Sequence, residues 1–139
     1  MKRRYLIVGL AILPLSVLIW RPWQSPFDSH FTFPLPDTAK VVGYQRTWAG
    51  LDSADDFAFA VTSDALRDAI IKEWKLEPAV RTSDAESFAK VVGGPAWWPG
   101  STLDQLPERY GRKDQVRTKY WSLWVDRENG KLYAECGDW

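Results

Sequence analysis

The sequence predicts an α+β fold: an N-terminal membrane helix, a Pro-rich stalk, and a two-layer domain in which helices cover one face of an antiparallel sheet of about four strands. Three observations predict it. A basic and then apolar segment opens the chain, strand-like alternation stands at both ends of the remainder, and helical periodicity lies between them. With 139 residues, the chain has room for one such domain and a short appendage. The expected order is β-β-α-α-β-β.

Residues 1–20 have the pattern of a signal-anchor. Three basic residues precede an uncharged run that spans about 24 Å as a helix, at ~1.5 Å per residue, against a hydrocarbon core of ~30 Å. No pair of small residues follows the run, which favours an uncleaved anchor; a cleaved signal, which would leave a secreted domain, is the alternative. The basic start predicts a cytoplasmic N-terminus and an extracytoplasmic bulk. The expected anchor residues are Lys2, Arg3, Arg4, Tyr5 and Trp20.

Residues 21–39 combine four prolines with three phenylalanines. Proline at this density disfavours helix and sheet, so we expect a stiff extended stalk between the membrane and the domain. His30 lies in this segment, where we expect it to be solvated. The domain itself is then expected over residues 40–139.

The first half of the domain is expected to be a hairpin followed by helices. Residues 41–48 and 56–61 alternate as strands, with Phe57 and Phe59 on one face. A helix is expected from Thr62 or Ser63 to about residue 75, because its apolar residues recur at helical spacing. A second, shorter helix is expected after the capping-box pattern at 83–86, and a third short turn from Ser101. The stripe of the first helix is Leu66, Ala69, Ile70 and Trp74.

The C-terminal segment is expected to be a second hairpin, with strands at 116–126 and 131–136 around an Asn-Gly turn. A loop of two or four residues places Leu123 and Cys136 on one apolar face, whereas a three-residue loop would bury charge. The even loop is therefore expected, and Cys136 is expected to act as a small buried apolar residue.

Charge and composition exclude several classes of function. The formal net charge is zero, and the part beyond residue 20 carries three more acidic than basic side chains, so no nucleic-acid partner is expected. One Cys and one His exclude a disulfide framework, a multi-Cys metal site and a His-rich one. His30 and Cys136 stand far apart in the chain, so no Cys-His dyad is expected. We find no motif for a nucleophile, a phosphate loop, a metal or a cofactor, and assign no catalytic, metal or cofactor residue.

Two aromatic features are candidate binding surfaces. Trp97 and Trp98 stand in a Pro/Gly-bounded loop, and the second face of the C-terminal hairpin carries further rings beside hydroxyl and carboxyl groups. Such rings suit a sugar face or an extended peptide, but they equally suit a face covered by the rest of the domain. The candidate surface is Trp97, Trp98, Tyr120, Trp124 and Tyr133. A basic run at 109–119 is expected to be a solvated connector, or a contact for an acidic partner or lipid headgroups.

The sequence therefore predicts a single-pass membrane protein whose small extracytoplasmic domain binds a partner without catalysis. The expected partners are the membrane itself, through residues 5–20, and an envelope protein or a cell-wall glycan. Two alternatives are a small envelope hydrolase that uses paired carboxylates, such as Asp55 with Asp56 or Asp126 with Glu135, and a structural subunit of a membrane assembly.

Overall fold

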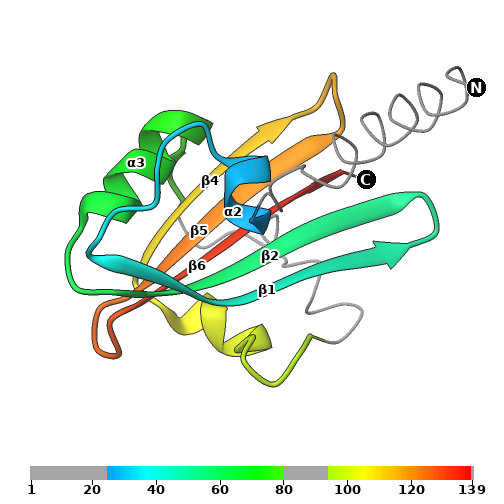
Figure 1. Ribbon diagram of the computed structural model, residues 1–139. Helices are drawn as coiled ribbons and strands as arrows, with labels where there is room; N and C mark the ends of the chain where they lie inside the picture. The colour runs from blue at the N-terminus through cyan, green and yellow to red at the C-terminus, as the bar shows by residue number, and fades with distance from the viewer. Residues whose placement is uncertain (1–24, 80–93, 139) are drawn as a thin grey trace, which may run out of the picture.

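The computed structural model describes residues 25–79 and 94–138, which build one six-stranded antiparallel sheet in the order β1-β2-β6-β5-β4-β3 (Figure 1). The predicted four-stranded α+β fold is wrong, because strands outnumber helices in the described part and the sheet gains β3 and β4. The predicted second helix after residue 83 lies outside the described residues. The elements are α2 (Pro26–His30), β1 (Ala39–Ala49), β2 (Asp52–Val61), α3 (Ala65–Trp74), β3 (Glu77–Pro78), η1 (Gly100–Gln105), β4 (Glu108–Asp114), β5 (Lys119–Asp126) and β6 (Lys131–Asp138).

The segment from residue 25 to 38 is part of the folded domain and not an extended stalk. Ser25 caps the short helix α2, which has proline in its first turn, where a missing backbone N–H costs nothing. Phe27 and Phe31 are 2% and 5% exposed, and they pack on each other and on the sheet. Burying two such rings stabilises the docking of α2 by several kcal/mol, at about 1.5–3 kcal/mol each. Residues 25–38, which were expected in the stalk, are therefore packed on the domain.

The predicted helix after the first hairpin is confirmed as α3. Leu66, Ile70 and Trp74 of the predicted stripe are buried against the sheet. The helix ends where Lys75 adopts a left-handed conformation with φ of 52°, and its N–H donates to the carbonyl of Ile71.

The predicted C-terminal hairpin and its even loop are confirmed in β5 and β6. Leu123 lies opposite Ala134, as expected for a four-residue turn from 127 to 130, and Gly130 supplies the positive φ of 60° that this turn requires. The strand before it was missed: residues 108–114 form β4, which pairs with β5 along its whole length. Its polar sequence does not alternate between apolar and polar residues, so its pairing with β5 is what identifies it as a strand.

The first hairpin is also confirmed, but its turn is tighter than expected. Ala49 pairs with Asp52, so only Gly50 and Leu51 connect β1 to β2 where a loop of seven residues was predicted. A bulge between Val41 and Gly43 shifts the alternation of β1, which leaves Val42 exposed.

The sheet has an apolar cluster on each face, and Figure 1 shows what covers them. Helices α2 and α3 cover the larger cluster, which contains Phe57, Phe59 and Leu123. The segment that includes η1 covers the smaller one, which contains Trp98 and Trp124. The prediction that helices cover only one face of the sheet is therefore wrong.

Candidate functional site

A group of polar side chains lies on the face of the sheet that α2 covers, near the end that carries the β1–β2 turn. Asp55 of β2 stands opposite Cys136 of β6, and α2 brings His30 over both. A pocket of about 290 Å³ opens beside them. The residues that line it are His30, Arg46, Ser53, Asp55, Lys119, Trp121, Cys136, Gly137 and Asp138.

The expectation that His30 is solvated in a stalk is wrong. Its side chain is 14% exposed, and Nε2 donates to Oδ2 of Asp55 over 3.0 Å. Nδ1 faces the carbonyl oxygen of Pro26 at 2.9 Å. Nδ1 also lies 2.8 Å from the hydroxyl oxygen of Ser29, so Pro26 and Ser29 together fix the orientation of the ring. The hydrogen bond to Asp55 raises the pKa of His30 against the opposing effect of burial.

Asp55 accepts hydrogen bonds from three side chains. The Tyr44 hydroxyl donates to Oδ1 over 2.7 Å, and the Arg46 guanidinium donates to both oxygens, from Nε over 2.8 Å and from Nη2 over 2.9 Å. Burial by itself raises the pKa of this carboxyl group, but the donors from His30, Arg46 and Tyr44 outweigh it and hold the pKa well below its usual range. Asp55 is therefore an ionised carboxylate held in one orientation.

Cys136 completes the group, since its Sγ, Nε2 of His30 and a carboxylate oxygen of Asp55 all lie within 4.8 Å of one another. The pair that the sequence analysis placed far apart thus meets in space. Burial, and then the charge of Asp55, raises the pKa of the Cys136 thiol to about 12. Nε2 of His30 donates to Asp55 and so does not present a lone pair to the thiol proton. The arrangement is not that of a cysteine nucleophile with its base.

The candidate carboxylate pairs of the hydrolase alternative do not form. Asp55 and Asp56 are neighbours on one strand and point to opposite faces of the sheet. Asp126 accepts hydrogen bonds from the backbone N–H and the side-chain amide of Asn129 in the β5–β6 turn. Asp56 instead lies opposite Glu135, and both are 0% exposed. A substrate in solvent does not reach this pair.

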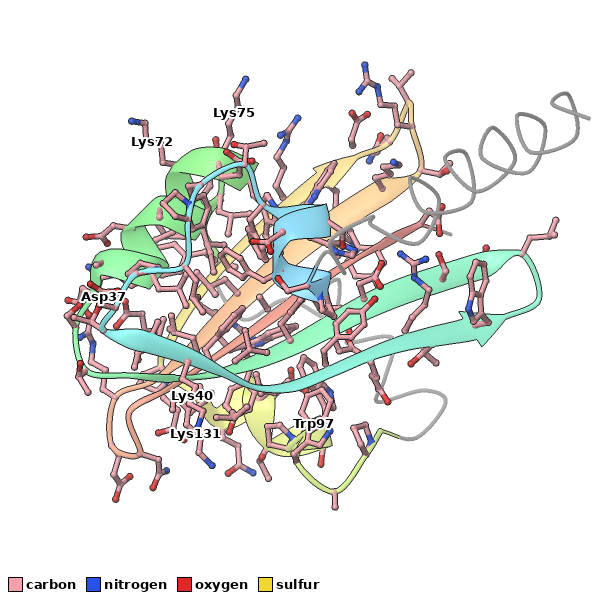
Figure 2. The ribbon with its side chains drawn as sticks, viewed as in Figure 1. Asp37, Lys40, Lys72, Lys75, Trp97 and Lys131 are labelled. Carbon is pink, nitrogen blue, oxygen red and sulfur yellow. The ribbon has the colours of Figure 1, made fainter. Side chains whose placement is uncertain are left out.

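The candidate aromatic surface is largely covered. Trp98, Trp124 and Tyr133 are 5%, 1% and 5% exposed, and the ring of Trp98 packs edge-on against the other two, with centroids 6.1 and 5.8 Å away. Tyr120 is partly buried on the same face. Trp97, labelled in Figure 2, is partly buried against Gly43 of β1. Of the two alternatives from the sequence, these positions match the covered face.

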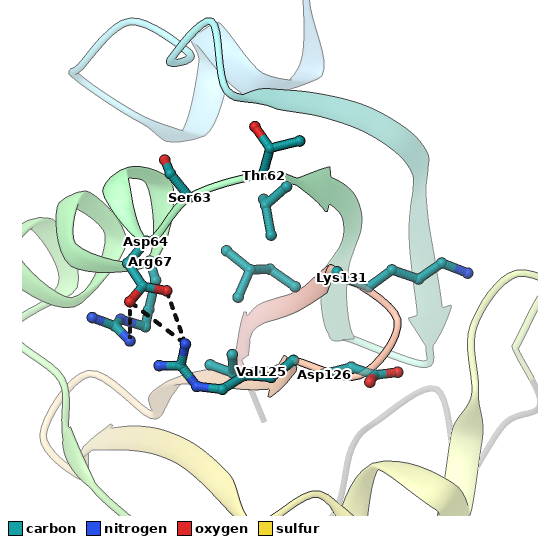
Figure 3. A pocket seen from close by; sticks show the side chains of 11 residues that line it. Thr62, Ser63, Asp64, Arg67, Val125, Asp126 and Lys131 are labelled. Carbon is teal, nitrogen blue, oxygen red and sulfur yellow. Dashed lines mark hydrogen bonds and ion pairs between the residues drawn. The ribbon is translucent and has the colours of Figure 1, made fainter.

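A second pocket, of about 200 Å³, lies at the opposite end of the sheet, beside the β5–β6 turn (Figure 3). Asp64 pairs there with Arg67 over 3.0 Å and with Arg127 over 3.1 Å. Both arginines also bind Glu108. Burial raises the pKa of Glu108, but the donors from Arg127 and Tyr110 outweigh it and lower the pKa. These charges neutralise one another, so this pocket is an ion-pair network that ties α3 to β4.

The basic run at 109–119 is divided between the strand and the turn that follows it. Arg109 is buried and donates to the carbonyl oxygen of Ala79, and Arg112 lies over the ring of Trp121 at 5.0 Å. Arg117 and Lys119 are exposed. Lys113 is exposed as well, so a partner can reach these three side chains but not Arg109.

No helix among residues 25–79 and 94–138 has the length and apolar character that crossing a membrane requires. The predicted anchor at 1–20 lies outside the described residues. Comparison of the chain with protein-family models, with curated proteins and with solved structures finds no significant match in any of the three.

Proposed function

We propose that this chain is a single-pass membrane protein whose extracytoplasmic domain lies directly on the membrane surface and acts by binding rather than catalysis. The sequence of residues 1–20 supports the anchor, with three basic residues before an uncharged run. The distance between that run and the folded domain supports the position of the domain.

The observation that carries the proposal is that α2, capped by Ser25, is docked on the sheet. Five residue steps separate Trp20, the end of the apolar run, from Ser25. A fully extended chain covers at most about 18 Å in five steps, at ~3.3–3.6 Å per residue. The β1 strand of 11 residues is about twice as long, at ~3.4 Å per residue. If Trp20 lies at the outer interface, one surface of the domain is close to the lipid.

One end of the sheet has the composition that a membrane surface favours. Among the described residues, four large apolar side chains are exposed, and three of them lie at the end that carries the β1–β2 and β4–β5 turns: Trp48 at 64%, Leu51 at 96% and Val116 at 95%. Arg117 and Lys119 lie beside Val116. Apolar loop tips next to basic residues suit insertion among the headgroups of anionic lipids. The turn at the other end, residues 127–130, is polar.

An envelope protein fits the described surface better than a glycan does. A glycan requires exposed rings, and the candidate rings are mostly buried. Strand β1, by contrast, is the outer strand of the sheet, and among the described residues no strand pairs with its second edge. Such an edge is the place where an extended segment of a partner protein adds a strand.

Anchoring and topology are tested in the cell. We expect the protein to resist carbonate extraction and a C-terminal phosphatase fusion to be active outside the membrane. A mature N-terminus near residue 25 would instead show a cleaved signal.

The contact with lipid is tested on the full chain reconstituted in nanodiscs that contain brominated lipids, which quench nearby indoles. We expect quenching to be weaker in Trp48→Phe than in wild type. In a chain that keeps Trp48, we expect the double variant Leu51→Ser, Val116→Ser to weaken quenching as well, because its loop tips no longer insert into the lipid. Trp121→Phe, on the face of the sheet, is the matched control and should leave the quenching unchanged. Equal quenching in wild type and Trp48→Phe overturns the proposed orientation.

A further inference from the structure

We propose that His30, Asp55 and Cys136 form a binding site for one divalent transition-metal ion of the zinc class. The three residues come from α2, β2 and β6, and one ligand atom of each lies within 4.8 Å of the other two. This site does not depend on the membrane anchor, and its test is independent of the test of the proposed function.

The donor set fits this class of metal. Zinc takes thiolate sulfur, imidazole nitrogen and carboxylate oxygen, at about 2.3, 2.0–2.1 and 2.0–2.2 Å. In a tetrahedral site these distances place the ligand atoms roughly 3.3–3.6 Å from one another. Nε2 of His30 and Oδ2 of Asp55 are 3.0 Å apart, and no separation in the set exceeds 4.8 Å. Movements of about 1 Å, within the reach of side-chain rotation, would bring all three onto one ion.

The surrounding groups orient the ligands as they do in metal sites. Nδ1 of His30 donates to the carbonyl of Pro26, which directs Nε2 towards Asp55. Metal-binding histidines commonly have such a partner on the second nitrogen. Tyr44 and Nε of Arg46 hold Oδ1 of Asp55, while Oδ2 accepts from His30 and from Nη2 of Arg46, so a metal ion at Oδ2 would replace the His30 proton and leave the Arg46 contact in place. The register of β2 against β6 fixes Asp55 opposite Cys136.

Charge and access also agree with the site. A divalent ion with one thiolate and one carboxylate ligand is neutral, and its binding releases the thiol proton and the Nε2 proton to solvent. The positive charge of Arg46 is paired with Asp55, and Asp138 adds a carboxylate to the lining of the same pocket. This pocket of about 290 Å³ leaves one side of the three ligands open, so water is the expected fourth ligand. A bound ion would tie α2 to the neighbouring strands β2 and β6.

Cobalt(II) is the probe, since its bond to a thiolate gives a near-ultraviolet charge-transfer band. The full chain is purified in detergent without a tag that contains His or Cys, stripped of metal and titrated with cobalt. Cys136 is the only cysteine, so this band reports Cys136 alone. We expect the band to saturate at one equivalent, and zinc to displace cobalt and abolish it. No band at excess cobalt, in protein that remains folded by circular dichroism, overturns the site.

Variants then separate a three-ligand site from binding to the thiol alone. We expect Cys136→Ser to remove the band, and His30→Gln and Asp55→Asn each to weaken cobalt affinity at least tenfold, since loss of even an outer-shell partner costs about 10–100-fold. Asp52→Asn, three residues earlier on β2, is the matched control and should bind as wild type does. Unchanged affinity in His30→Gln overturns the proposal, and this variant keeps the test valid if Asp55→Asn fails to fold.

Discussion

Asp56 on β2 lies directly opposite Glu135 on β6, and neither side chain is exposed to solvent. Gln45 on β1 donates to Oδ2 of Asp56 over 2.9 Å. Burial, and then the neighbouring Glu135, raises the pKa of Asp56 to about 9. Two ionised carboxylates side by side in a core repel each other and lose their hydration, so the pair keeps a proton at neutral pH.

This retained proton predicts that stability falls as pH rises. An aspartate in the unfolded chain loses its proton near pH 3.9, so between about pH 4 and 9 the folded state binds more protons than the unfolded state does. The contribution is complete below pH 4 and is lost as pH rises through 9. Asp56→Asn removes the titrating group, so its urea midpoint should fall less than that of wild type between pH 5 and 9.5. Asp68→Asn, on the exposed side of α3, is the control. Parallel curves for wild type and Asp56→Asn would show that Asp56 is ionised.

The register of the β5–β6 hairpin predicts that alanine substitutions at two of its positions differ greatly in their cost to stability. Leu123 is fully buried between the sheet and α3, and Leu123→Ala should cost about 2–5 kcal/mol through lost apolar contact and a cavity. Lys131 is exposed at the turn, and Lys131→Ala should change the unfolding free energy by less than about 0.5 kcal/mol. Denaturant midpoints report both values, and the reverse order would contradict the observed register.

Two tryptophans of the same chemistry should differ sharply in their contribution to stability. Trp98 packs on Trp124 and Tyr133, and Trp98→Ala should cost about 3–5 kcal/mol. Trp48 is 64% exposed near the β1–β2 turn, and Trp48→Ala should cost less than about 0.5 kcal/mol in detergent. Thermal melts of the two variants provide the comparison. A melt of Trp98→Ala at the wild-type temperature would show that the covering segment does not contribute to the core.

The contact between Gly43 and Trp97 predicts a strong coupling. A methyl group on Gly43 would lie 2.6 Å from Cε3 of Trp97, closer than side chains approach one another. Gly43→Ala should therefore cost about 1–3 kcal/mol, by displacing the indole. In the Trp97→Ala background the same change meets no ring and should cost much less. A double-mutant cycle with additive energies would show that Trp97 does not pack on β1.

The elements that the sequence predicted well are those whose evidence is contiguous in the chain. The turn at Asn129 and Gly130 sets the register of the last hairpin, because a change of loop parity would move every side chain to the other face. The spacing of Leu66, Ile70 and Trp74 likewise predicts one buried face of α3. In both cases the pattern and the structure that it produces span no more than 20 residues.

The helix α2 was missed although a local signal for it exists. Ser25 before Pro26 is a cap followed by a permitted first-turn proline, and Phe27 and Phe31 stand one helical turn apart. The density of prolines in residues 21–39 outweighed this signal. Strand β4 had no such signal, since its polar residues gain a place in the sheet only through pairing with β5.

By itself the sequence determined the basic and apolar pattern at the N-terminus, the two hairpins and α3, because each depends on neighbours in the chain. Only the tertiary structure decided which aromatic side chains are buried and which polar groups come into contact. His30 and Cys136 come together because α2 docks its phenylalanines on the sheet and β6 pairs with β2. Asp56 and Glu135 meet through the same pairing of β2 with β6. Contacts between distant residues follow from burial and strand pairing over the whole chain, and no local pattern of charge or spacing encodes them.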